Sequence, residues 1–141
     1  MKVSRILGIG TDIVSVKRMQ KIIERGVGYE KRFMSKVLHQ IEIKEYENID
    51  EINQKSRYLA SRWGLKEATV KACGNRSIYF PGVYLAKYEK SKPKLTIEGE
   101  TNERILLREL EVSRMHASIS HEDEYAVAFV IMETFKAFET F

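Results

Sequence analysis

The chain has 141 residues, a hydrophobic fraction of 43% and a formal net charge of +4. This length fits one domain, predicted to span residues 1–141, and the hydrophobic fraction argues against disorder. No apolar run is long enough to cross a bilayer, so the sequence predicts a globular protein with no membrane partner. The single cysteine, Cys73, excludes an internal disulfide and cannot by itself form a zinc site.

The first predicted strand contains the segment GIGTDIV, residues 8–14. Alternation of side chains along a strand places Asp12 on the same face as Gly8 and Gly10, and Ile6 on that face too. Two glycines weaken a strand, which suggests that another stretch of backbone or a ligand comes close to Asp12. The alternative is a bend in which Asp12 caps the following helix.

The first helix is predicted to follow Ser15, its candidate N-cap, and to run to about Arg25. Six basic residues lie within sixteen positions of this region: Lys17, Arg18, Lys21, Arg25, Lys31 and Arg32. They indicate either an acidic partner or a solvated helical face.

A second helical region is predicted from Tyr29 to Ile49, with a break expected near His39. Its inward side chains are expected to be Phe33, Val37, Ile41 and Tyr46. The stretch 49–55 is predicted to be a polar connection.

The third helix is predicted from Lys55 to Cys73, with Gly74 as its C-terminal stop. One apolar face is defined by residues at helical spacing: Leu59, Trp63 and Val70. Glu67 falls on that same face, so its carboxylate must either lose water or face a charged group. A carboxylate in such a position is a candidate for a functional site.

The rest of the chain is predicted to contain mainly strands and turns. Strands are expected at 82–89 and 93–99, a short helix at about 102–110, and a hairpin whose strands are 115–120 and 125–132. Helices and strands are therefore segregated along the chain. This order favours an α+β fold with a mostly antiparallel sheet packed against helices.

Three segments combine into a known pattern: GIGTDIVSVKRM (8–19), RYLASRWGLKEATVKACG (57–74) and HASISHEDEYAVAFVI (116–131). Together they resemble the signature regions of holo-acyl-carrier-protein synthases, the small 4′-phosphopantetheinyl transferases, over about a third of the chain. The resemblance implies the 4′-phosphopantetheinyl transferase fold. It also implies Mg²⁺-dependent transfer of phosphopantetheine from coenzyme A to a serine of an apo acyl carrier protein, with release of adenosine 3′,5′-bisphosphate.

By this resemblance, Asp12 and Glu67 are the Mg²⁺ ligands, and the glycines beside Asp12 would leave room for metal and phosphate. Glu67 could also accept the serine proton through a metal-bound water, and a water relay through Asp12 fits equally well. Lys71 matches the second lysine of the motif. It could pair with a transferring phosphate or form an i,i+4 ion pair with Glu67.

Further matches concern coenzyme A. Arg62 matches an arginine that contacts its phosphates, a task suited to a guanidinium fork. Lys66 matches the first lysine of the motif, with an ordinary solvated side chain as its alternative. His121 matches a histidine expected to contact a cofactor phosphate, with Ser120 nearby. Gly74 could pass close to the nucleotide or simply end the helix.

The basic helix matches the surface on which the family docks its acidic acyl carrier protein. Arg18 matches a carrier-contacting arginine, and Lys17 and Lys21 lie close to it. Two rival functions remain: a basic non-catalytic module that binds an acidic protein or nucleic acid, and a coenzyme A binder that has lost transfer. Neither rival function needs Mg²⁺ to convert a substrate, so Mg²⁺-dependent activity would distinguish the transferase from both.

The chain also departs from the family pattern. The loop 74–82 reads GNRSIYFPG where bacterial members have a Gly-Thr-Gly loop, and Trp63 stands where phenylalanine is usual. Small bacterial members are trimers whose site lies between subunits, so a homotrimer is one expectation. The departures favour a fungal mitochondrial relative, although no presequence is recognised, and a cytoplasmic location is the alternative.

Overall fold

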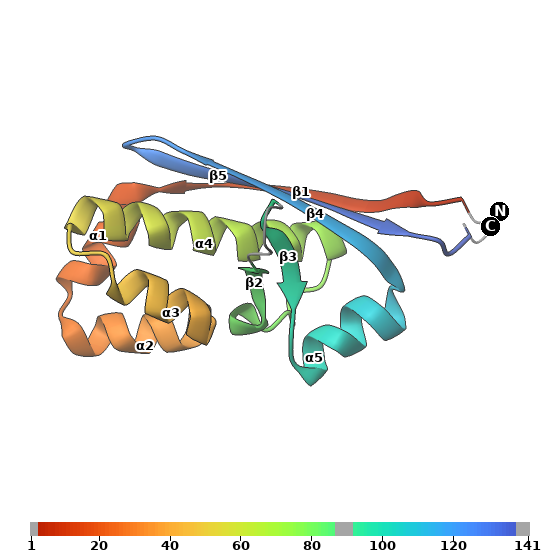
Figure 1. The fold of residues 1–141 in the computed structure, drawn as a ribbon, viewed down its shortest axis with the longest axis horizontal. Coiled ribbons are helices and arrows are strands. Elements are labelled where there is room, and N and C mark those ends of the chain that lie inside the picture. The colour runs from red at the N-terminus through yellow and green to blue at the C-terminus, as the bar shows by residue number, and fades with distance from the viewer. Residues whose placement is uncertain (1–2, 87–91, 138–141) are drawn as a thin grey trace.

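The computed structural model describes residues 3–86 and 92–137. Its elements are β1 (Arg5–Ser15), α1 (Val16–Glu24), α2 (Val27–Val37), α3 (Gln40–Glu47), α4 (Ile52–Cys73), the 3₁₀ turn η1 (Phe80–Gly82), β2 (Val83–Ala86), β3 (Lys94–Ile97), α5 (Glu100–Glu103), the π-helical turn η2 (Arg104–Glu109), β4 (Val112–His121) and β5 (Tyr125–Thr134). The helices all lie on one side of a long sheet (Figure 1). None of the described helices is both long enough and apolar enough to cross a bilayer.

The main sheet has three strands in the order β1–β5–β4, and every neighbouring pair is antiparallel. Strands β2 and β3 form a separate antiparallel pair. The expected α+β architecture with antiparallel sheets is confirmed. The predicted closing hairpin is confirmed as well, with β4 and β5 each extending beyond the predicted limits.

A register shift between Ile6 and Gly8 interrupts the alternation along β1. Because one extra residue moves the preceding side chains to the other face, Ile6 lies on the outer face and is 60% exposed. The prediction that Ile6 shares a face with Asp12 is therefore wrong. From Gly8 to Val14 the predicted alternation holds.

Helix α4 packs along the inner face of β1 and β5 (Figure 1). A Cβ atom at Gly8 would lie 2.0 Å from the carbonyl oxygen of Ala72, and one at Gly10 would lie 1.9 Å from that of Ala68. The close approach predicted beside Asp12 is thus made by the backbone of α4. The hypothesis that these glycines make room for metal and phosphate is wrong, because the helix occupies that space.

We expect Gly10→Ala to destabilise the fold by about 3 kcal/mol or more. The added methyl group would overlap backbone atoms of α4, which cannot move without displacing the helix from the sheet. The free energy of unfolding in urea measures this effect. Gly28→Ala is the matched control, because an added Cβ there meets only the far end of the Arg32 side chain, at 3.9 Å; equal losses for the two variants would contradict the packing argument.

The second helical region divides into α2 and α3 at Leu38 and His39, which confirms the predicted break. His39 caps α3 by accepting a hydrogen bond from the Ile41 amide through Nδ1 at 3.0 Å. Ile41 itself is 44% exposed, so its predicted inward position is wrong. Helix α4 begins at Ile52, within the stretch predicted to be a polar connection.

In the segment after α4, the strands are shorter than predicted, and the short helix is partly π-helical. The strands expected at 82–89 and 93–99 are β2 and β3, although positions 87–89 lie outside the described residues. The helix expected at about 102–110 consists of α5 followed by the π-helical turn η2.

Candidate active site

The two predicted metal ligands lie at the same level between β1 and α4. Gly8 and Gly10 face Ala72 and Ala68, and Val14 contacts Gly64, so β1 and α4 run antiparallel. Asp12 lies between Gly10 and Val14 on this inner face and therefore faces the part of α4 between residues 64 and 68. Glu67 belongs to this part of the helix. The structure thus places two acidic residues that are separated by 55 positions in the sequence on opposing segments of β1 and α4.

Lys71 connects the two elements. Its Nζ donates to Asp12 Oδ1 at 3.0 Å and to the carbonyl oxygen of Thr11 at 2.9 Å. Neither of the two roles proposed for Lys71 from the sequence includes this ion pair. The N-cap position of α1 is held by Ser15, and no hydrogen bond from an α1 amide to Asp12 occurs among the described residues, so the capping role is not seen. The Lys71 side chain is 53% exposed and that of Asp12 is 16% exposed, so the pair lies at the rim of the molecule and can be reached by a ligand.

The residues present fit a magnesium ion. Mg²⁺ prefers oxygen ligands and usually retains several waters, so one or two carboxylates together with phosphate oxygens are sufficient. Asp12 and Glu67 supply two carboxylates, and the ammonium group of Lys71 shows that a cation is already accommodated beside Asp12. No group of three or more metal-ligating side chains occurs among the described residues.

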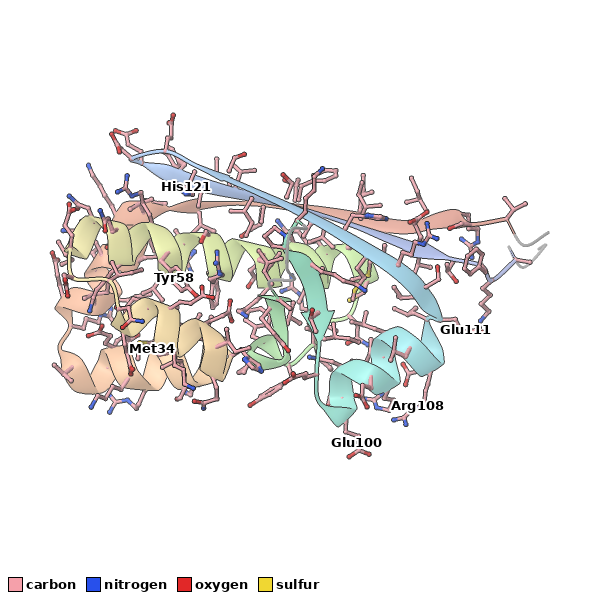
Figure 2. The ribbon with its side chains drawn as sticks, viewed as in Figure 1. Met34, Tyr58, Glu100, Arg108, Glu111 and His121 are labelled. Atoms are coloured by element: carbon pink, nitrogen blue, oxygen red, sulfur yellow. The ribbon has the colours of Figure 1, made fainter. Side chains whose placement is uncertain are left out.

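A second group of predicted residues lines an open groove of about 490 Å³ between α4 and the end of β4. Arg62 and His121 both line it, together with Tyr58 and Arg57. Figure 2 shows His121 at the end of β4 above the part of α4 that carries Tyr58. This groove brings the predicted phosphate contacts Arg62 and His121 into one place. Arg57 was not singled out from the sequence, because nothing in its pattern separates it from other charged helical residues.

Two other predicted cofactor residues lie elsewhere. Ser120 is opposite Val127 on the exposed outer face of the sheet, whereas the neighbouring His121 lines the groove. Gly74 ends α4 in the left-handed conformation with φ 72°, and its amide donates to the carbonyl oxygen of Val70 at 2.8 Å. This positive φ and the amide hydrogen bond fit the helix-cap role.

The two groups lie on opposite flanks of α4. Lys71 follows Arg62 by nine positions, which corresponds to about 180° around an α-helix and about 13 Å along its axis. Lys71 contacts the edge strand β1, and the groove of Arg62 reaches β4, the other edge of the sheet. One chain therefore carries two separated half-sites: a carboxylate half-site (Asp12, Glu67, Lys71) and a groove half-site (Arg57, Arg62, His121).

Lys66 lies in neither half-site. It is completely buried, and its Nζ donates to Glu42 Oε1 at 2.7 Å, to the carbonyl oxygen of Phe80 at 3.1 Å and to that of Val83. These three acceptors use all three donors of the ammonium group, so none is left for a phosphate. Both sequence interpretations, a cofactor contact and a solvated side chain, therefore disagree with the structure.

The predicted carrier-binding residues share an exposed basic surface on α1. Lys17, Arg18 and Lys21 are all exposed, while Met19 on the same helix is completely buried. The guanidinium carbon of Arg18 lies 5.8 Å from the centre of the Trp63 ring, a cation–π distance that orients the side chain. Sequence periodicity located this surface correctly, because the buried and exposed sides of α1 follow the helical repeat.

Comparison with known proteins identifies the family. The model of the 4′-phosphopantetheinyl transferase superfamily matches residues 8–130, a range that contains both half-sites. The chain belongs to this superfamily.

Similar members of the superfamily cover nearly the whole chain. The holo-[acyl-carrier-protein] synthase of Aliivibrio fischeri is 35% identical over 133 residues, covering 92% of this chain and 98% of the relative. The crystal structure of the Plasmodium yoelii synthase matches with a TM-score of 0.78 and 26% identity, covering 94% of this chain and 98% of that one. The Helicobacter pylori synthase in complex with coenzyme A matches with a TM-score of 0.69 and 28% identity, covering 88% and 98%.

Proposed function

We propose that this chain is a magnesium-dependent holo-[acyl-carrier-protein] synthase. It transfers 4′-phosphopantetheine from coenzyme A to a serine hydroxyl of an apo acyl carrier protein and releases adenosine 3′,5′-bisphosphate. The observation that carries the proposal is the ion pair between Lys71 of α4 and Asp12 of β1, with Glu67 one helical turn from Lys71. Relatives that match nearly the full chain are holo-acyl-carrier-protein synthases, which supports the reaction and its two substrates.

The residues of the carboxylate half-site have distinct roles in this reaction. Asp12 and Glu67 would hold Mg²⁺, which offsets the negative charge of the pyrophosphate. Lys71 is paired with Asp12 and reaches the same opening, so its ammonium group can move to a phosphate oxygen. Glu67 is the candidate acceptor of the serine proton, directly or through a water. Arg62 and His121 would bind phosphates of coenzyme A in the groove.

Intact-protein mass spectrometry tests the proposed reaction. An apo acyl carrier protein is incubated with this chain, coenzyme A and Mg²⁺, and a carrier heavier by one phosphopantetheine is the expected product. EDTA should prevent the mass shift. If several different apo carriers remain unmodified, the non-catalytic alternatives gain support over the transferase.

The separation of the two half-sites supports a homo-oligomer. The outer face of the sheet carries large apolar side chains that are between 37% and 64% exposed: Ile9, Ile13, Tyr125, Val127 and Phe129. A continuous apolar patch on a sheet is typical of a protein interface. Contact between copies through this face, as in a homotrimer, would allow the groove half-site of one copy to approach the carboxylate half-site of its neighbour.

The basic surface of α1 is the proposed docking site for the acidic carrier. Exposed charges at the rim of an interface mainly raise the association rate and set specificity. The surface adjoins the carboxylate half-site, because α1 directly follows β1, the strand that carries Asp12. A carrier bound on α1 would therefore present its serine close to Asp12 and Glu67.

We expect Arg18→Glu to raise the KM for the carrier about tenfold and to leave the KM for coenzyme A unchanged. The substitution reverses a charge on the docking surface but alters no residue of either half-site. Steady-state kinetics with each substrate varied in turn measures the effect. Arg108→Glu makes the same charge change on the exposed turn η2, away from α1, and should alter neither constant. Equal increases in the two KM values for Arg18→Glu would refute the docking assignment.

A further inference from the structure

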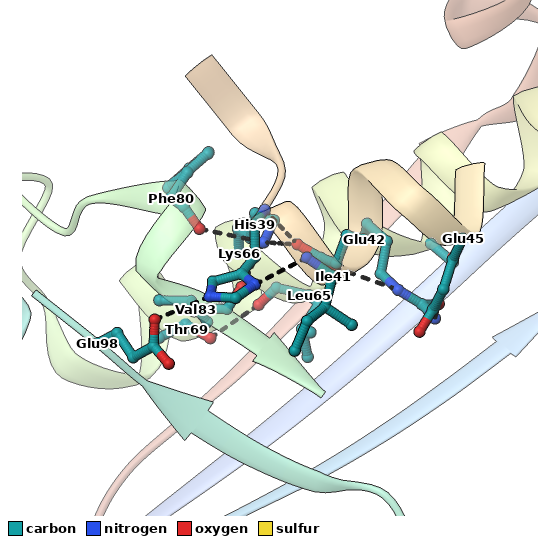
Figure 3. A network of polar contacts seen from close by, with 12 residues as sticks. His39, Ile41, Glu42, Glu45, Leu65, Lys66, Thr69, Phe80, Val83 and Glu98 are labelled. Atoms are coloured by element: carbon teal, nitrogen blue, oxygen red, sulfur yellow. Dashed lines mark hydrogen bonds and ion pairs between the residues drawn. The ribbon is translucent and has the colours of Figure 1, made fainter. Parts of the chain in front are cut away.

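A buried carboxylate, Glu42, lies between the core lysine and the groove. Glu42 belongs to the first turn of α3 and is only 2% exposed. Its Oε1 accepts from Lys66 at 2.7 Å, and its Oε2 lies 3.3 Å from Nε of Arg62. Figure 3 shows Glu42 and Glu45 on α3, with Lys66 reaching from α4 toward Glu42. Glu42 thus links a residue of the hydrophobic interior to a residue of the predicted phosphate groove.

The two oxygens of Glu42 have different tasks. The other acceptors of Lys66 are the neutral carbonyl groups of Phe80 and Val83, so Glu42 is the anion that compensates this buried ammonium group. Burial lowers the pKa of Lys66, and the charge of Glu42 opposes that effect. Oε1 alone makes the contact with Lys66. Neither Oε2 nor Nε of Arg62 has a hydrogen-bond partner in the described structure, and the two atoms meet only in an ion-pair contact at 3.3 Å.

The environment of Arg62 shows why this contact matters. The Arg62 side chain is 18% exposed, and its guanidinium carbon lies 4.4 Å from the centre of the Tyr58 ring. Its terminal nitrogens approach Glu45 Oε2 at 3.6 Å and donate to Ser61 Oγ at 3.1 Å. These contacts and the Glu42 contact use at most three of its five N–H donors. At least two donors remain for a ligand in the groove.

We infer that Glu42 is a positioning residue for coenzyme A: it holds the inner edge of the Arg62 guanidinium, so that the remaining donors face the groove. The inference rests on the proposed function, in which Arg62 binds a phosphate. A fixed guanidinium loses less side-chain entropy when it binds a phosphate than a mobile one does. Glu42 itself touches no substrate and acts only through Arg62.

The test must separate this role from the compensation of Lys66. Glu42→Gln alone would leave the Lys66 ammonium group buried without a counter-charge and would destabilise the fold. Glu42→Gln is therefore made in a Lys66→Met background, in which Glu42 of the parent retains Arg62 as its partner. Arg62→Ala is made with Lys66 retained, so that Glu42 keeps one counter-charge, and the combination of Glu42→Gln with Arg62→Ala is made in the Lys66→Met background. Glu47→Gln is the control, because Glu47 is an exposed carboxylate on the same helix.

The expected result is a rise of about fivefold in the KM for coenzyme A on Glu42→Gln, with unchanged kcat and an unchanged KM for the carrier. When Arg62 is already alanine, Glu42→Gln should have no further effect on this KM. A merely structural role would lower the melting temperature without this dependence on Arg62. An unchanged KM for coenzyme A, or the same rise with and without Arg62, overturns the inference.

Two outcomes distinguish failure of this inference from failure of the proposed function. If Arg62→Ala leaves the KM for coenzyme A unchanged, the groove assignment itself is wrong. If the Lys66→Met background does not fold, Glu42→Asp decides instead, because it keeps the charge that compensates Lys66 but shortens the side chain by one methylene. A higher KM for coenzyme A in this variant supports the positioning role, and an unchanged KM overturns it.

Discussion

Glu67→Gln is expected to reduce kcat/KM for carrier modification by about 1,000-fold while the chain remains folded. The amide replaces a carboxylate one helical turn from Lys71, whose ammonium group contacts Asp12, so the site loses one of its two proposed anionic metal ligands and its candidate proton acceptor. A loss of this size corresponds to about 4 kcal/mol of transition-state stabilisation. The fold should tolerate the change, because the two side chains have nearly the same shape and Glu67 is partly exposed.

The measurement is the initial rate of holo-carrier formation by intact-protein mass spectrometry, at several Mg²⁺ concentrations. Glu103→Gln removes a carboxylate from the exposed surface of α5 and should retain full activity. Thermal melting of all variants monitors folding. Wild-type rates for Glu67→Gln would show that this carboxylate does not take part in the reaction. A rate that falls only in proportion to a loss of folded protein would point to a structural role instead.

Most elements of the fold can be predicted because local sequence and tertiary packing agree. The stop of α4 at Gly74, the break at His39 and the closing hairpin of β4 and β5 all follow from capping, turn and alternation patterns. The face of Ile6 could not be predicted, because a β-bulge depends on pairing with β5 rather than on local alternation.

A mitochondrial location stays a prediction, which microscopy of a fluorescent fusion would test.

The candidate site was predictable in its residue types but not in its arrangement. The motif identified Asp12, Glu67 and Lys71, yet the ion pair between Lys71 and Asp12 depends on how β1 lies against α4. The burial of Lys66 cannot be predicted locally, because a lysine beside Glu67 on a helix gives no sign in the sequence that it is fully buried. The position of Glu42 does have a local signal in the sequence. Glu42 lies three residues after His39, which is the spacing of a capping box, and this spacing places Glu42 in the first turn of α3.

Mixing two impaired variants is expected to restore activity if each active site is shared between copies. One variant is Glu67→Gln, which damages the carboxylate half-site, and the other is Arg62→Ala, which damages the groove half-site. In a ring assembled at random from equal amounts, about a quarter of the sites would combine an intact carboxylate half-site with an intact groove half-site. Activity at low coenzyme A should therefore approach about a quarter of the wild-type value after joint refolding.

The reason for this expectation is the geometry of α4. Arg62 and Lys71 lie on opposite flanks of the helix, so the pyrophosphate of one coenzyme A molecule is not easily shared by both half-sites of a single chain. A mixture of Asp12→Asn and Glu67→Gln is the decisive control. Both substitutions damage the same half-site, so no arrangement of copies can produce an intact one. If the first mixture shows only the summed activities of its two variants, each chain forms its whole site alone, and the apolar outer face of the sheet must have another role.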